Sequence, residues 1–148
     1  MKPARHSGHQ TQWAAQFAVA SELCKLGYEV ALTMGNHPSV DLMVVSPEGR
    51  TQFGVDVKGL HARNHWVVKP KEKRGELFYV LALVPAGKPN RYFVLSQDEA
   101  NAEIAINEEA CERRARDRGQ PATPGFEGIP FAAADVDAHR DAWGKLPR

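Results

Sequence analysis

The feature that most constrains this fold is a pair of strand-like runs, residues 40–45 and 51–58, which flank the sequence SPEGR. Pro and Gly favour a turn there, and the β-branched and apolar residues on both sides favour strands. If residues 47–50 form the loop, an antiparallel hairpin pairs Ser46 with Thr51 and continues outward from that pair. One face of the hairpin is then wholly apolar, as expected for a sheet packed on a core, with Val44 opposite Phe53, Leu42 opposite Val55, and Val40 opposite Val57.

The other face of the predicted hairpin carries three charged residues. Asp41 lies opposite Asp56, and Lys58 follows two residues later on the same face. Two directly opposed carboxylates destabilise a sheet unless a proton, a cationic side chain or a metal ion lies between them. Mg²⁺, or Mn²⁺ in its place, binds such oxygen ligands and could activate water beside a phosphoryl group, with Lys58 as its catalytic partner. The alternative is a solvated polar patch with a salt bridge.

Helical and strand-like segments alternate along the rest of the chain. We expect a flexible start over residues 1–10, a helix over residues 12–26, and a second helix that begins at a capping-box pattern of Ser96 and Glu99. Further short strands are predicted at residues 30–33, 66–68, 77–84 and 91–95, and a short final helix within residues 135–146. This order predicts a single α/β domain over residues 1–148, with its core at 12–95 and a helical C-terminal part at 96–148.

Asp41 together with Asp56-Val57-Lys58 resembles the motif of the PD-(D/E)XK nuclease superfamily. The surrounding layout of helix, L-x-x-x-GY-x-V, loop, DL and DVK is most similar to its small resolvase-like and homing-endonuclease-like members. The resemblance implies a restriction-endonuclease-like core, in which a mixed central sheet of about four to five strands carries an N-terminal helix and a helix after the sheet. It also implies a Mg²⁺-dependent DNA endonuclease in which Asp41, Asp56 and the backbone carbonyl of Val57 hold the metal and Lys58 assists attack on a phosphodiester.

Many members of that superfamily add a glutamate from the first helix, and the corresponding position here is Gln16. Gln16 shares a helical stripe with Val19 and Leu23, so it faces the sheet and is expected to be buried. Its amide oxygen could touch a metal directly or through water, and we include it among the catalytic residues. The alternative is an amide that ties the helix to the sheet. Two charged ligands should in any case bind Mg²⁺ more weakly than three.

A basic segment follows the predicted metal site, where nucleic-acid phosphates would approach. Between Asp56 and Arg74 it holds six Lys or Arg residues against two acidic ones. The candidate nucleic-acid contacts are His61, Arg63, Asn64, His65, Lys69, Lys71, Lys73 and Arg74. The alternative is a solvated hairpin turn. The basic run at 113–118 is expected to be the solvated last turn of a helix, and His37 is a weaker candidate for a contact to phosphate.

The remaining expectations concern partners and location. A chain of 148 residues leaves little room for a separate recognition domain, so a homodimer or a larger partner would supply selectivity for DNA. Two cysteines without metal-ligand spacing, the absence of a long apolar run and the lack of a signal peptide predict a cytoplasmic protein without a membrane span or an organic cofactor. A catalytically impaired binding module, or a subunit active only in a defence or mobile-element complex, is the alternative function.

Overall fold

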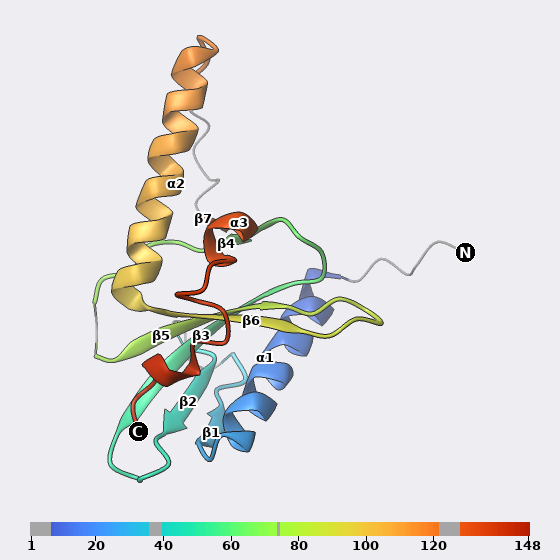
Figure 1. Cartoon of the computed structure of the whole chain (residues 1–148), viewed down its shortest axis with the longest axis vertical. Coiled ribbons are helices and arrows are strands. Elements are labelled where there is room, and N and C mark those ends of the chain that lie inside the picture. The colour runs from blue at the N-terminus through green and yellow to red at the C-terminus, as the bar shows by residue number, and fades with distance from the viewer. Residues whose placement is uncertain (1–6, 36–39, 74, 122–127) are drawn as a thin grey trace.

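The computed structural model describes residues 7–35, 40–73, 75–121 and 128–148, and a five-stranded sheet lies at its centre (Figure 1). The strands lie in the order β1-β2-β3-β5-β6. Their bounds are Glu29–Leu32, Leu42–Val45, Gln52–Leu60, Leu77–Leu83 and Arg91–Ser96. Only β3 and β5 run parallel, so the sheet is mixed. With helix α1 before the sheet and helix α2 after it, the predicted α/β layout is confirmed.

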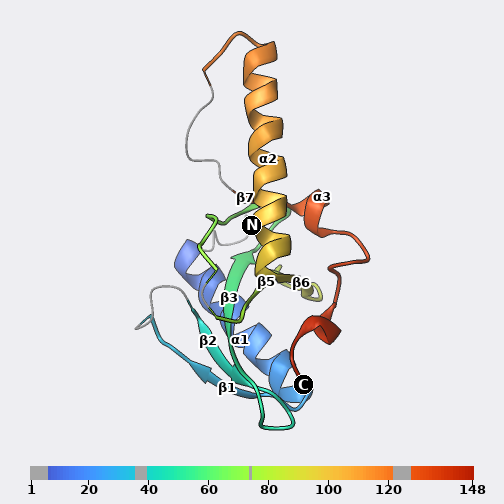
Figure 2. The ribbon, with the colours of Figure 1, turned by 90° about the vertical axis from the view of Figure 1, so that its left-hand side faces the viewer.

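Helix α1 (Gly8–Lys25) covers one face of the sheet (Figures 1 and 2). It begins four residues earlier than predicted, because Ser7 and Gln10 form a capping box that satisfies the free N–H groups of the first turn. The expected flexible start over residues 1–10 is therefore wrong for residues 7–10. Residues 1–6 lie outside the described part. The first core cluster joins α1 to the apolar hairpin face through Ala15, Val19, Leu23, Leu42, Val44, Phe53, Val55 and Val57.

A second core cluster covers the opposite face of the sheet. It contains Trp66 of strand β4 (His65–Val67), Ile129 of strand β7 (Gly128–Pro130), and Ala100 and Ile104 from the first turns of helix α2 (Gln97–Asp117). Strands β4 and β7 pair with each other in a separate small sheet. Beyond these first turns α2 extends away from the sheet (Figures 1 and 2), and Ile106 is largely exposed.

The C-terminal part is less helical than predicted. The expected helix within residues 135–146 is wrong, since only the short helices α3 (Phe131–Ala134) and η1 (Trp143–Lys145) form. The segment between them lies along strand β6: the N–H of Val94 donates to the carbonyl of His139, and the N–H of Asp141 donates to the carbonyl of Tyr92. These backbone groups bond to the sheet edge, so they cannot form a helix. Across the described ranges, no helix has the length and apolar character needed to cross a membrane.

The contact between α1 and β3 depends on the small size of Gly59. A Cβ atom at this position would lie 2.7 Å from the Cβ of Ala15 and 2.9 Å from the carbonyl oxygen of Thr11. Gly59→Ala should therefore lower the free energy of unfolding by about 1–3 kcal/mol, measured by urea unfolding. Gly8→Ala is the matched control, because a Cβ there meets nothing within 4 Å. Equal stability of the two variants would contradict this close helix–strand contact.

Candidate functional site

The hairpin of β2 and β3 has the predicted register throughout its ladder. Leu42 pairs with Val55 and Val45 with Gln52, and the N–H of Ser46 donates to the carbonyl of Thr51 at 2.8 Å. The ladder ends at Leu42, and the N–H of Asp41 donates to the Val55 carbonyl. The strand alternation breaks here. Val40 packs with the second core cluster instead of facing α1 beside Val57, so its predicted place on the apolar hairpin face is wrong.

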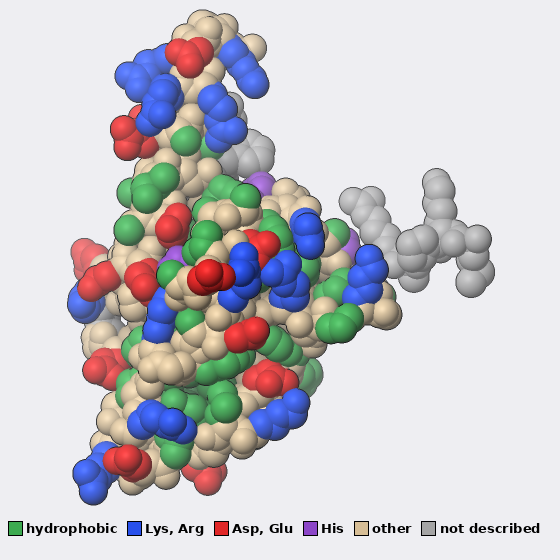
Figure 3. Space-filling view, viewed as in Figure 1, with side chains coloured by type: hydrophobic (Ala, Val, Ile, Leu, Met, Phe, Trp, Pro, Cys, Tyr) green, Lys and Arg blue, Asp and Glu red, His purple; other side chains and the backbone are tan. Residues whose placement is uncertain are grey.

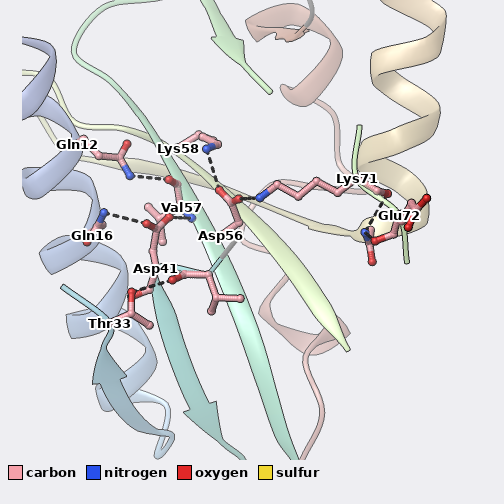
Figure 4. Close-up of polar contacts among 11 residues, drawn as sticks. Gln12, Gln16, Thr33, Asp41, Asp56, Val57, Lys58, Lys71 and Glu72 are labelled. Atoms are coloured by element: carbon pink, nitrogen blue, oxygen red, sulfur yellow. Dashed lines mark hydrogen bonds and ion pairs between the residues drawn. The ribbon is translucent and has the colours of Figure 1, made fainter. Parts of the chain in front are cut away.

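Strand β3 continues past the end of β2, which leaves one edge of it without a strand partner. Two side chains take that place. The Asp41 carboxylate accepts from the N–H of Val57 at 2.8 Å through Oδ2. Gln12, on α1, donates from Nε2 to the Val57 carbonyl at 2.7 Å and accepts from the N–H of Gly59 at 3.2 Å. The open edge is thus closed by a carboxylate and an amide (Figure 4).

Gln16 connects the same helix to Asp41. Its side chain is buried, and Nε2 donates to Oδ1 of Asp41 at 3.1 Å. Both Asp41 oxygens therefore accept a hydrogen bond from a neutral donor. Thr33, directly after β1, donates from its hydroxyl to the carbonyl of Val40, which lies just before Asp41, at 2.7 Å. Gln16 thus ties the helix to the sheet, and it does so through the carboxylate predicted to hold a metal.

Asp56 projects from the other face of β3 and is only 2% exposed. Its Oδ1 lies 3.1 Å from Nζ of Lys58, and its Oδ2 lies 2.6 Å from Nζ of Lys71. The contact between Lys58 and Oδ1 lacks the geometry of a hydrogen bond, and Oδ1 accepts no hydrogen bond from the described residues. Two ammonium groups therefore compensate this buried carboxylate (Figure 4).

Helix α2 holds Lys71 in place. The Lys71 carbonyl accepts from Nε2 of Gln97 at 3.2 Å and from Nδ2 of Asn101 at 3.3 Å. Tyr79 lies beside Asp56 in the parallel strand β5, and the Lys71 ammonium is 5.9 Å from the centre of its ring. Burial, together with the charge of Asp56, raises the pKa of Tyr79 to about 12, so its phenol is neutral at physiological pH.

The structure brings some of the predicted site residues together and separates others. Asp41 and Gln16 lie on the α1 side of β3, whereas Asp56 projects from the other face with Lys58 and Lys71, so the predicted placement of Asp41 and Asp56 on one hairpin face is wrong. The two groups meet at the free edge of β3, where the charge of Asp56 helps to raise the pKa of Asp41. Lys71 was predicted only as a nucleic-acid contact. Lys73 instead pairs with Asp98 on α2 at 3.1 Å. His61 and Lys69 are exposed, and Arg63, Asn64 and His65 line a groove beside α2. Arg74 and His37 lie outside the described residues.

Sequence reasoning missed Gln12, Thr33, Tyr79, Gln97 and Asn101. Gln12 had a detectable signal, since it precedes Gln16 by four residues and so shares its helical face. The other four depend on contacts between segments distant in the chain, for which no local pattern exists.

The donor set at this site fits Mg²⁺. Carboxylate and carbonyl oxygens are its preferred ligands, and within the described part of the chain the buried Oδ1 of Asp56 accepts no hydrogen bond. The oxygens of Asp41 and the carbonyl of Val57 each accept one hydrogen bond and keep a second lone pair. No group of three or more His, Cys, Asp or Glu side chains suited to a metal occurs among the described residues. A metal here would have two charged protein ligands and would keep several waters.

Comparison with known proteins adds no assignment: no family model, no curated protein and no solved structure matches this chain.

The environment of Asp41 predicts a pH dependence of stability in metal-free protein. Burial raises its pKa and the charge of Asp56 adds to this, while the Val57 N–H and the two lysines oppose it. The folded chain therefore binds this proton more tightly than the unfolded chain, and the resulting contribution to stability is full below the unfolded pKa and lost as pH rises through the folded pKa. In urea unfolding with chelator across acidic pH, the free energy of unfolding should rise more steeply with pH in Asp41→Asn than in the exposed control Asp98→Asn, because the variant lacks a contribution that falls as pH rises. Identical slopes would contradict it.

The Lys71 ammonium lies 2.6 Å from Oδ2 of Asp56, so its charge should oppose a divalent cation bound at the same carboxylate. Lys71→Met should raise the affinity for Mn²⁺ roughly tenfold, because it removes one positive charge beside the Asp56 carboxylate that would bind the ion. The affinity can be measured by the loss of the free Mn²⁺ signal in electron paramagnetic resonance. Lys73→Met is the matched control, as it removes a lysine of the same segment that pairs with exposed Asp98. Unchanged or weaker binding in Lys71→Met would exclude competition.

Proposed function

We propose that this protein is a Mg²⁺-dependent endonuclease of the PD-(D/E)XK kind that hydrolyses phosphodiester bonds in DNA. The observation that carries the proposal is the pair Asp56 and Lys58 on one strand, next to the Asp41 carboxylate at the start of the neighbouring strand. Lys58 lies 3.1 Å from Asp56, and both Asp41 and Asp56 are held by contacts to the protein. The predicted homodimer and cytoplasmic location remain part of this proposal, and both described cysteines are free thiols.

The protein groups divide the chemistry among them. Bound Mg²⁺ would supply charge stabilisation at the phosphoryl oxygen and acidify a water molecule. Asp41 and Asp56 would hold it, together with the Val57 carbonyl. Gln16 and the Val57 N–H fix the orientation of the Asp41 carboxylate. Lys58 is one-third exposed, so its ammonium can reach a phosphate in solvent and stabilise the charge that develops there.

Purified protein with Mg²⁺ or Mn²⁺ should cleave duplex, branched or single-stranded DNA. Asp56→Asn and Lys58→Met should each reduce the cleavage rate by at least about a hundredfold, because each removes a charge that acts on the reacting phosphate. Asp98→Asn is the control for the loss of one carboxylate. The assay is a gel-based time course with a labelled set of the three DNA forms. No cleavage of any form, with no difference between wild type and Asp56→Asn, would refute the enzyme.

A second candidate is a DNA-binding module without catalysis. It is favoured by the protein contacts of the two carboxylates, since Asp41 accepts two hydrogen bonds and Asp56 pairs with two lysines. The polar cluster is therefore stable without metal, and Gln16 adds no charge to it. Salt-dependent DNA binding that persists in Asp41→Asn, without cleavage, would select this function over the nuclease.

A further inference from the structure

A groove of about 700 Å³ lies beside the projecting half of α2, away from the carboxylates. One side is formed by the segment after β3 and the other by one face of the helix, and Pro130 and Phe131 complete the lining. The polar part of the lining includes Arg63, Asn64, His65, Asn107, Arg114 and Arg118. None of the residues around Asp41 and Asp56 lines it.

Three arginines of this groove have no carboxylate partner among the described residues. The guanidinium of Arg63 lies 5.0 Å from the centre of the Phe131 ring, and Arg114 donates to the Ala110 carbonyl and the thiol of Cys111. Several other described arginines do pair with carboxylates. Arg91 and Arg140 both bind Asp135, and Arg113, next to Arg114, lies 3.7 Å from Glu109. Arg63, Arg114 and Arg118, none of them neutralised by a described carboxylate, thus share one concave surface.

The described lining of the groove also contains no acidic residue. Lys and Arg side chains gather around the far end of α2 (Figure 3). The last turn of a helix carries partial negative charge, which stabilises these arginines but repels an anion. A ligand here must therefore interact with the arginines themselves. Guanidinium groups bind phosphate through paired N–H donors, which makes phosphate the matching chemistry.

We propose that this groove is a phosphate-binding site and that its ligand is the backbone of a nucleic-acid strand. The groove joins two basic segments that are separate in the sequence, residues 63–65 and 114–118. From Asn101, which holds Lys71 beside Asp56, α2 rises seventeen residues to Arg118, or about 25 Å. A free nucleotide cannot reach from one end to the other, whereas about seven base pairs of duplex can.

The phosphate site does not rest on the proposed nuclease activity, although its assignment to nucleic acid deepens that proposal. The test is fluorescence anisotropy of labelled single-stranded and duplex oligonucleotides in chelator, over a series of salt concentrations. Arg114→Gln and Arg118→Gln should each weaken binding several-fold and lower the salt slope by about one, and the double variant should lose roughly tenfold or more. Arg116→Gln is the matched control, because it removes the same charge from the same exposed helix end outside the groove.

Equal weakening by Arg116→Gln, or no weakening by the groove variants, would overturn the site. A second experiment measures the binding of pyrophosphate and of a mononucleotide by the increase that each causes in the thermal unfolding midpoint. If these bind in an Arg114-dependent manner while oligonucleotides do not, the nucleic-acid assignment is overturned and the phosphate site stands. Asp56→Asn separates the two proposals, since it should abolish cleavage while oligonucleotide binding keeps its dependence on Arg114 and Arg118. Binding without cleavage in wild type would refute the nuclease and support the groove.

Discussion

The closure of the free edge of β3 by side chains is the interaction on which the candidate site depends. β3 is longer than its partner β2, so the N–H and carbonyl of Val57 would have no strand to bond to. The Asp41 carboxylate and the Gln12 amide take that role. A buried backbone group left without a partner costs about 1–3 kcal/mol, so these contacts also stabilise the fold. The same contacts bring Asp41 beside β3, close enough for the charge of Asp56 to raise its pKa.

The charges of the site balance without a metal ion. Asp41 and Asp56 are offset by Lys58 and Lys71, and the buried Asp56 contacts both ammonium groups. A divalent ion added to this set would leave it with excess positive charge. An incoming phosphodiester would cancel part of that excess, as would movement of Lys71 into solvent. Metal and nucleic acid should therefore bind more tightly together than either does alone.

The sequence predicted the hairpin and its register because both follow from local patterns. A tight turn fixes the pairing, and an unbroken apolar face allows only one register. The orientation of Asp41 could not be predicted, because the regular alternation ends at Leu42 and the carboxylate then follows the free edge of β3. Lys71 was identified only as a basic residue. Its place at Asp56 is set by Gln97 and Asn101, which are distant in the sequence. The final segment was expected to be helical from its local pattern. Its actual bonds to β6 join residues distant in the sequence, so that pattern could not reveal them.

Gln16 gives this site a property that a glutamate at the same position would not. Its Nε2 donates to Oδ1 of Asp41, so an amide stabilises the carboxylate in the absence of any cation. A glutamate there would place a second negative charge against Asp41 and would require a metal or a proton to fold stably. The chain therefore needs no metal to hold its site in shape. Weaker metal binding is the expected consequence, because one charged ligand is replaced by a neutral one. A metal-dependent activity of this protein would then be set by the local concentration of metal and nucleic acid, rather than by a permanently bound ion.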